Sequence, residues 1–112
     1  MALTFTKMNS QGNNFILIDL AKEKFELSEG IVSRIIKNIK TDFDQLLMID
    51  YEKNSETILC QIFNNDGSRA YQCGNGLRAI MLYLNSKYSY FKISVDIANK
   101  KYSVTIDDKK VI

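Results

Sequence analysis

Cys73 stands in a segment whose residue types are suited to proton transfer. It is followed directly by Gly74, Asn75 and Gly76. Glycines allow backbone angles that other residues resist, and they let a ligand approach the main chain closely. An apolar helical pattern begins at Leu77, so the free N–H groups and positive dipole end of that helix should point back at the segment. A thiol at such a position has its thiolate favoured, and the same N–H groups would hold a ligand carboxylate.

The two cysteines have different surroundings. Cys60 lies within an alternating apolar pattern, which is typical of a buried residue. For Cys73 the residues by themselves allow two interpretations, a reactive thiol or a tight glycine turn into a helix. A zinc site is not expected, because the chain has no His and only two cysteines, with twelve residues between them. A redox or acyl-transferring thiol is a weaker hypothesis, because the chain lacks both His and a Cys-x-x-Cys pair.

Composition excludes several classes of protein. The 112 residues fit one domain, 1–112, and 46% hydrophobic residues supply a core. Fifteen Lys and Arg against thirteen Asp and Glu are scattered rather than clustered, so nucleic-acid binding is not expected. No stretch approaches the roughly 18 apolar residues of a membrane helix, and the first residues lack a secretory signal pattern. We therefore expect a cytoplasmic protein.

Two helices and about seven short strands are predicted from periodicity. An apolar stripe predicts an amphipathic helix over 29–40, with Ser28 as N-cap. A helix over 77–84 is apolar nearly all round, which is typical of a buried helix. A polar loop is expected at 9–14, within a hairpin, and a turn at 65–67. Strands or extended segments are expected at 3–8, 15–20, 45–51, 57–63, 69–72, 90–97 and 101–106, with a further strand beginning at 111.

The order of these elements predicts an α+β fold. Most connections are short enough for antiparallel hairpins, and the second helix must be enclosed. The economical arrangement is a mostly antiparallel sheet that curls around a buried central helix. Cys73 would then lie where that helix begins.

Several segments of the chain resemble the diaminopimelate epimerase family. The pattern Asn-x-Asp-Gly-Ser followed by Cys-Gly-Asn-Gly is similar to the segment of that family that carries its first catalytic cysteine. The resemblance extends, in the same order, over the whole 112 residues. The other matching segments are Phe5-Thr6-Lys7-Met8, Gly12-Asn13, Phe43-Asp44-Gln45 and Ile62-Phe63-Asn64.

The resemblance implies an amino-acid epimerase that needs no pyridoxal or other cofactor and converts LL- to meso-diaminopimelate for lysine and peptidoglycan precursor synthesis. Two similar domains each supply one cysteine: a thiolate removes the α-proton, and a thiol protonates the opposite face. Cys73 matches the first of these cysteines. Residues matching substrate-binding positions are Asn13, Gln45, Asn64, Gly74 and Asn75.

Two loops and one side chain depart from the family pattern. Asn9-Ser10-Gln11 replaces His-Gly-Leu, with Asn14 in place of Asp. Lys40-Thr41-Asp42 replaces Gly-Ile-Gly. Arg69 stands where an acidic residue is common. These changes lie close to the implied substrate-binding positions.

Length is the largest departure, because 1–112 corresponds only to the amino-terminal half of the two-domain family. We expect no useful epimerisation by the isolated chain, because inversion needs a proton acceptor and a donor on opposite faces of the carbon. The expected partners are an amino-acid substrate and a carboxy-terminal epimerase domain or a second chain. A homodimer pairing two Cys73 residues is a variant of this hypothesis. The alternative is a catalytically inactive truncated half, or a binding module that needs a partner domain.

Overall fold

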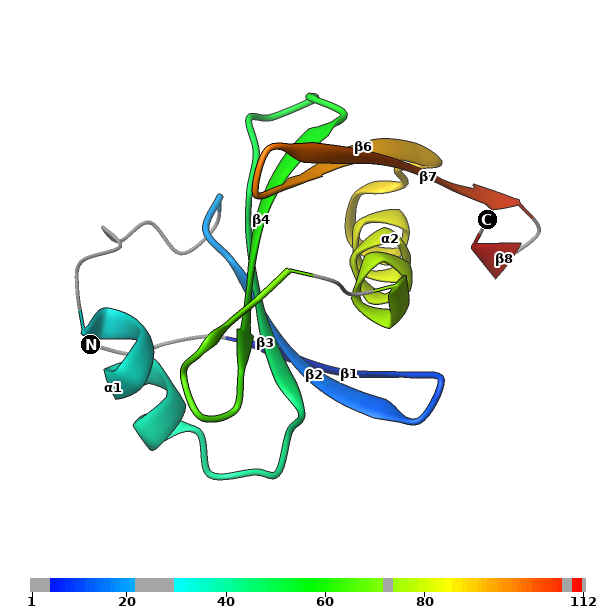
Figure 1. The fold of residues 1–112 in the computed structure, drawn as a ribbon. Coiled ribbons are helices and arrows are strands. Elements are labelled where there is room, and N and C mark those ends of the chain that lie inside the picture. Colours follow the sequence, from blue (N-terminus) through cyan, green and yellow to red (C-terminus); the bar gives the residue numbers. More distant parts are fainter. Residues whose placement is uncertain (1–4, 22–29, 72–73, 108–109, 112) are drawn as a thin grey trace.

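The computed structural model describes residues 5–21, 30–71, 74–107 and 110–111, in which a curled sheet encloses one helix (Figure 1). The other helix, which is the first in the sequence, packs on the opposite face of the sheet. The elements are β1 (Thr6–Ser10), β2 (Asn13–Asp19), α1 (Ile31–Asn38), β3 (Gln45–Asp50), β4 (Thr57–Asn64), β5 (Arg69–Ala70), α2 (Gly74–Tyr88), β6 (Lys92–Ile97), β7 (Lys100–Asp107) and β8 (Lys110–Val111). The expected α+β architecture around a buried central helix is confirmed.

Strand order along the sheet is β1-β2-β3-β4-β6-β7-β8, with β5 paired beside β4. Five of the described strand pairs are antiparallel, whereas β2–β3 and β4–β6 are parallel. Both parallel pairs are joined through a helix, α1 in the first case and α2 in the second. A helical crossover returns the chain to the end from which it left, so the next strand runs parallel. The sheet is mostly antiparallel, as predicted, but mixed.

The core has two layers, one on each face of the sheet. Phe15 and Leu17 of β2 pack with α2, whereas Ile16 and Ile18 pack with α1. Burial on both faces explains why β2 and β3 are continuous apolar runs rather than alternating ones. Ile35 is buried in the α1 layer, where the predicted apolar stripe of that helix contacts the sheet.

The β1–β2 hairpin has a much shorter connection than the six-residue loop that we predicted. Asn9 pairs with Asn14 and Ser10 with Asn13, which leaves only Gln11 and Gly12 in the turn. Both turn residues have positive φ, 53° and 86°. Two successive positive φ values match the twist of a tight two-residue hairpin, and glycine adopts them without strain. The polar residues on either side therefore belong to the strands.

The helix bounds also differ from the predictions. α1 begins at Ile31, after Gly30 in the left-handed region, and ends before Ile39, whose backbone is extended. Ser28, the predicted N-cap, lies outside the described residues. α2 starts at Gly74, three residues earlier than predicted, and continues to Tyr88. Gly74 and Gly76 therefore lie in the first helical turn rather than in a loop.

The remaining predictions agree to within about two residues at each end where they can be compared. Cys60 is 4% exposed on an apolar strand face, as expected. The turn at 65–67 is present, with Gly67 at φ 93°. Residues 3 and 4 of the first predicted strand lie outside the described residues.

Candidate active site

Three carboxamide side chains project from the same face of the sheet, those of Asn13, Gln45 and Asn64. They lie at the start of β2, the start of β3 and the end of β4 respectively. Each stands two positions from a core residue in the cluster that packs against α2, namely Phe15, Leu47 and Ile62. Because side chains alternate along a strand, all three amides face the α2 side.

Strand register brings the three amides to one edge of that face. Phe15, two residues after Asn13, is the parallel partner of Gln45. Gln45 is in turn the antiparallel partner of Asn64. Three side chains from distant parts of the sequence thus form a polar end to an otherwise apolar surface.

Gln45 and Asn64 are joined directly. Gln45 Nε2 donates to Asn64 Oδ1 at 3.1 Å, and Asn64 Nδ2 donates to Ser68 Oγ at 3.0 Å. Ser68 Oγ donates to Asp66 Oδ1 at 2.7 Å. Each polar group of this series has its orientation set by the next, so the Asn64 amide is held in one rotation.

Backbone hydrogen bonds join Asn64 to the turn that follows β4. The Asn64 N–H donates to the Ser68 carbonyl at 2.8 Å, and the Gly67 N–H donates to the Asn64 carbonyl at 2.9 Å. Asp66 accepts from the Ser68 hydroxyl and N–H, and these hydrogen bonds lower the pKa of the Asp66 carboxyl below its ordinary value. The carboxylate form of Asp66 is therefore the form that holds the turn.

Two residues that depart from the family pattern, Asn14 and Thr41, make hydrogen bonds between the strands and the segment before β3. The Asn14 N–H donates to Asp44 Oδ2 at 2.7 Å, and the Asp44 N–H donates back to the Asn14 carbonyl at 2.8 Å. Lys7 Nζ donates to Thr41 Oγ1 at 2.8 Å, which ties the segment before β3 to β1. Of the residues that depart from the family pattern, Asn14 thus bonds to Asp44, the residue before Gln45, and Thr41 bonds to Lys7.

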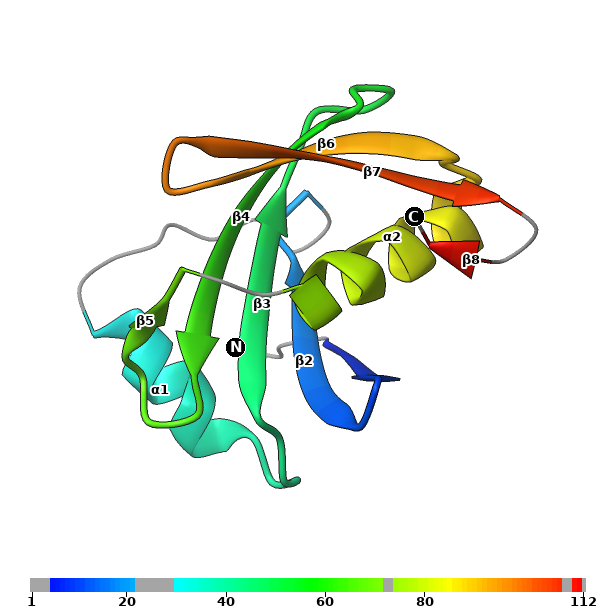
Figure 2. The ribbon, with the colours of Figure 1, turned by 45° about the vertical axis from the view of Figure 1, so that its right-hand side comes forward.

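α2 begins at the amide edge and runs away from it. Ala70 pairs with Ile62 next to Asn64, and Gly74 follows four residues later, within about 14 Å of extended chain. At the other end of β2, the Tyr83 hydroxyl of α2 contacts Asp19. In Figures 1 and 2 the first turn of α2 is nearer than its last turn to the β1–β2 turn.

The first turn of α2 has the properties of an anion site. The first N–H groups of a helix have no partner within it, and they carry the positive end of the helix dipole. No acidic residue lies in this turn. Gly74 is exposed and Asn75 is half-buried, and a Cβ added at Gly74 would meet no atom within 4 Å. A ligand can therefore approach the main chain here.

Cys73 directly precedes Gly74 in the sequence and lies outside the described residues, so its role stays a prediction. Of the other five predicted site residues, the structure brings Asn13, Gln45 and Asn64 to one edge of the sheet. Gly74 and Asn75 form the helix start that belongs to the same face. In the described part of the chain, no group of three Cys, Asp or Glu residues is arranged to hold a metal ion. None of its helices is long and apolar enough to cross a bilayer.

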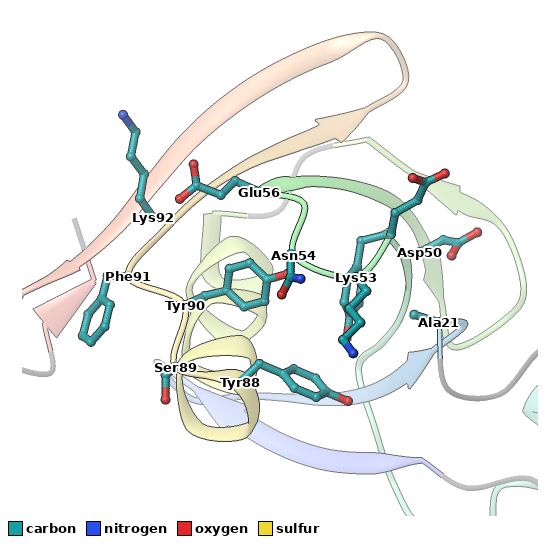
Figure 3. A pocket seen from close by; sticks show the side chains of 12 residues that line it. Ala21, Asp50, Lys53, Asn54, Glu56, Tyr88, Ser89, Tyr90, Phe91 and Lys92 are labelled. Carbon is teal, nitrogen blue, oxygen red and sulfur yellow. The ribbon is translucent and has the colours of Figure 1, made fainter.

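A hollow of about 1270 Å³ lies at the opposite end of α2 (Figure 3). Tyr88 and Tyr90 point into it, whereas Phe91 points away. A smaller hollow of about 430 Å³ lies beside the first turns of α2, next to Lys101–Val104 of β7. We place the candidate site at this end of α2, where the helix start and the three amide side chains lie. Gly74 lines the smaller hollow, whereas the other residues that line it belong to α2 and β7.

A buried carboxylate beneath the large hollow was missed by sequence reasoning. Asp19 is 5% exposed, and its Oδ2 accepts hydrogen bonds from the hydroxyls of Tyr51 at 2.7 Å and Tyr83 at 2.8 Å. Burial, together with the hydrogen bond to Asp19, raises the pKa of both tyrosines above the ordinary value of 10.0. The signal in the sequence was an acidic residue between the apolar run Phe15–Ile18 and Leu20. This network fixes α2 to the end of β2.

Sequence comparison identifies the relatives of the chain. A sequence model described as diaminopimelate epimerase matches residues 5–112. A diaminopimelate epimerase of Psychrobacter sp. is 32% identical over 108 residues, covering 95% of this chain and 37% of the relative. One from Coxiella burnetii is 39% identical over 88 residues, covering 77% of this chain and 32% of the relative. The chain thus spans about a third of the length of these relatives.

Solved structures support the fold. A predicted epimerase from Pseudomonas aeruginosa superposes with a TM-score of 0.74 at 10% identity, covering 98% of this chain and 41% of that one. A PhzF-family phenazine biosynthesis protein from Enterococcus faecalis gives a TM-score of 0.70 at 16% identity, covering 89% and 36%. At these identities the likeness concerns the fold alone. The family match over residues 5–112 and the collinear relatives carry the assignment: the chain belongs to the diaminopimelate epimerase family.

Proposed function

We propose that this chain is the half of a cofactor-independent amino-acid epimerase that supplies the first cysteine, acting on LL-diaminopimelate to give the meso isomer. One observation carries the proposal: the amides of Asn13, Gln45 and Asn64 and the start of α2 lie at the same end of one sheet face. Family membership supplies the reaction class. The reaction would feed lysine and peptidoglycan precursor synthesis in the cytoplasm.

In the proposed reaction the Cys73 thiolate takes the α-proton of the substrate. The electron pair of the broken C–H bond stays on the α-carbon and spreads into the carboxylate. A second cysteine, as a thiol, gives its proton to the opposite face of that carbon, and inversion is complete. The number of protons on the enzyme is unchanged, so no redox partner or cofactor is required.

The first turn of α2 would stabilise the charge that develops on the substrate carboxylate. N–H groups that are fixed before the reaction need no reorganisation as the charge grows, which is why such donors are effective in transition states. Gly74 leaves the approach to the main chain open. The amides of Asn13, Gln45 and Asn64 would hold the remaining polar groups of the substrate.

The second cysteine must come from outside this chain's core. Cys60 is 4% exposed within the layer between sheet and α2, so it cannot present a thiol to a substrate at the start of α2. We propose that a carboxy-terminal epimerase domain or a second chain supplies the missing thiol and covers the site. Closure between two domains also excludes water, which strengthens the electrostatic interactions within.

The alternative is a binding half without catalytic activity. It is favoured by the Gln45–Asn64 hydrogen bond, because Asn64 Oδ1 already accepts from Gln45 in the structure. Such a half would bind the amino acid without exchanging its α-hydrogen, and its uncovered apolar surface would promote association. The homodimer variant predicts a two-fold assembly, so a monomer by light scattering would count against it.

Alkylation of Cys73 by iodoacetamide tests the proposal on the chain itself. We expect Cys73 to react at pH 7 faster than an ordinary thiol with a pKa of about 8.5, and diaminopimelate to slow the reaction. The matched control is Cys60→Ser, which removes the buried thiol and should leave both results unchanged. A Cys73 that reacts like an ordinary thiol and gains no protection would contradict the proposed site.

Deuterium exchange then separates the two candidate functions. Incubated in D₂O with LL-diaminopimelate, the isolated chain should give no measurable inversion. Protection of Cys73 together with slow α-hydrogen exchange without inversion supports a catalytic half. Protection without any exchange supports the binding half. Robust inversion by a monomer would show that one cysteine suffices, and would overturn the two-cysteine mechanism.

A further inference from the structure

Ser10 is a buried polar residue that no proposed reaction step uses. Its side chain is 4% exposed, and its hydroxyl is enclosed and has no hydrogen-bond partner. Among the described residues, it is the one buried side-chain polar group without a hydrogen-bond partner. A buried hydroxyl without a partner loses its bonds to water and gains nothing in return. A hydrogen bond to a neighbouring polar group would remove this cost.

The neighbours of Ser10 follow from the register of the hairpin. Among the described strands, β1 lies at the edge of the sheet, with β2 as its neighbour. Ser10 is the direct partner of Asn13 across the Gln11-Gly12 turn. The next pair on the same face is Met8 with Phe15, and both of these side chains pack in the layer beneath α2. Ser10 and Asn13 thus share the α2 face, and Asn13 is the polar side chain opposite Ser10.

We propose that Ser10 is a positioning residue for Asn13. This inference rests on the proposed function, which makes Asn13 a substrate-binding amide. The Cβ atoms of directly opposed residues lie about 5 Å apart, a gap that a serine hydroxyl and a carboxamide can bridge with a small rotation. In the proposed arrangement this rotation, which the structure does not show, lets the Ser10 hydroxyl accept a hydrogen bond from Asn13 Nδ2. Asn13 Oδ1 then faces the space beside the start of α2.

The geometry favours this partner over two others. Direct contact between Ser10 and a ligand would require the hairpin to open, because the hydroxyl is enclosed. The first turn of α2 offers N–H donors, but these belong to a different element, whereas Asn13 is held opposite Ser10 by the tightest kind of hairpin turn. A fixed rotation of the Asn13 amide would present one acceptor, suited to a substrate ammonium group, rather than a mixture of donor and acceptor.

The test is the side-chain amide signal of Asn13 in the ¹⁵N-labelled chain, identified by its loss in Asn13→Asp. We expect at least one Nδ2 hydrogen to exchange with solvent several-fold more slowly in the wild type than in Ser10→Ala. Ser10→Gly, which also deletes the hydroxyl, should match Ser10→Ala. Ser10→Thr keeps the hydroxyl and should restore slow exchange. Ser33→Ala, at an exposed serine of α1 on the opposite face of the sheet, is the matched control and should change nothing.

Equal exchange rates in the wild type, Ser10→Ala and Ser10→Gly would overturn the inference, provided that the backbone signals show a folded chain. A changed backbone amide of Gly74 or Asn75 with an unchanged Asn13 side chain would assign the hydroxyl to α2 instead, and would equally overturn it. The measurement uses no substrate. It can therefore fail while Cys73 protection by diaminopimelate succeeds, or succeed while that protection fails.

Discussion

The side-chain amide of Gln45 donates a 3.1 Å hydrogen bond to the side-chain oxygen of Asn64, across the β3–β4 pair. Nineteen residues of sequence separate the two, and the strand register makes them direct partners. The contact lies on the face that α2 covers, at the end where that helix begins. It therefore links the sheet to the proposed site, and four predictions test this link and its surroundings.

Asn64→Ala should weaken both stability and ligand binding. The change removes the hydrogen bonds to Gln45 and Ser68, so urea unfolding should show a loss of about 1–2 kcal/mol. Protection of Cys73 by diaminopimelate should disappear. Gln61→Ala is the matched control, because Gln61 lies in the same strand on the opposite face. Retained protection in Asn64→Ala would exclude Asn64 from the site.

The turn that carries Asn64 should weaken in acid through Asp66. The pKa of Asp66 is lowered in the folded chain, so its contribution is complete above the ordinary value of 3.8 and is lost as the pH falls through the folded pKa. Asp66→Asn should therefore be less stable than the wild type at pH 6, and the difference should shrink below pH 4. Urea unfolding at both pH values measures it. A difference that grows in acid would contradict the assigned hydrogen bonds.

Tyrosine ionisation should limit stability in alkali. Tyr83 is 4% exposed and donates to Asp19, and its raised pKa means that the folded chain keeps a proton that the unfolded chain loses near pH 10. The unfolding free energy should be fully maintained below pH 10 and then fall by up to about 1.4 kcal/mol per pH unit for such a residue.

Tyr83→Phe isolates this effect. At pH 7 it should cost about 2 kcal/mol, because Asp19 loses one of its two hydroxyl donors. Above pH 10 its unfolding free energy should decline less steeply than that of the wild type. Tyr71→Phe, at an exposed tyrosine, serves as control. Parallel declines in the wild type and Tyr83→Phe would show that Tyr83 does not titrate in this way.

Cys60→Ser should destabilise the chain without affecting the proposed chemistry. A serine hydroxyl in the layer beneath α2 is a polar group in an apolar environment, with an expected cost of about 1–3 kcal/mol. Thermal unfolding measures the loss, and the alkylation rate of Cys73 should be unchanged once the variant is compared at a temperature where it is folded. A slower Cys73 reaction in the folded variant would mean that the two cysteines are coupled.

Periodicity predicted the apolar elements well, because buried positions are occupied mainly by apolar residues. The run at β2 and the stripe of α1 were assigned correctly from residue order. Polar residues led to wrong predictions, because a polar residue that pairs with a neighbouring strand cannot be told from a loop residue by its type. Asn9, Ser10, Asn13 and Asn14 resemble a loop, yet register places all four in strands. The glycines before Leu77 resemble a loop as well, but they form helical backbone at the start of α2.

The sequence by itself indicated the family and the buried second helix, since both depend on residue types and their order, and it supplied the candidate site residues, which stay predictions. Only the tertiary structure decided that two strand pairs are parallel, that Gln45 binds Asn64, and that Asp19 is buried beneath two tyrosine hydroxyls. These relationships join residues far apart in the chain, and local residue preferences carry no information about which distant strand supplies a partner.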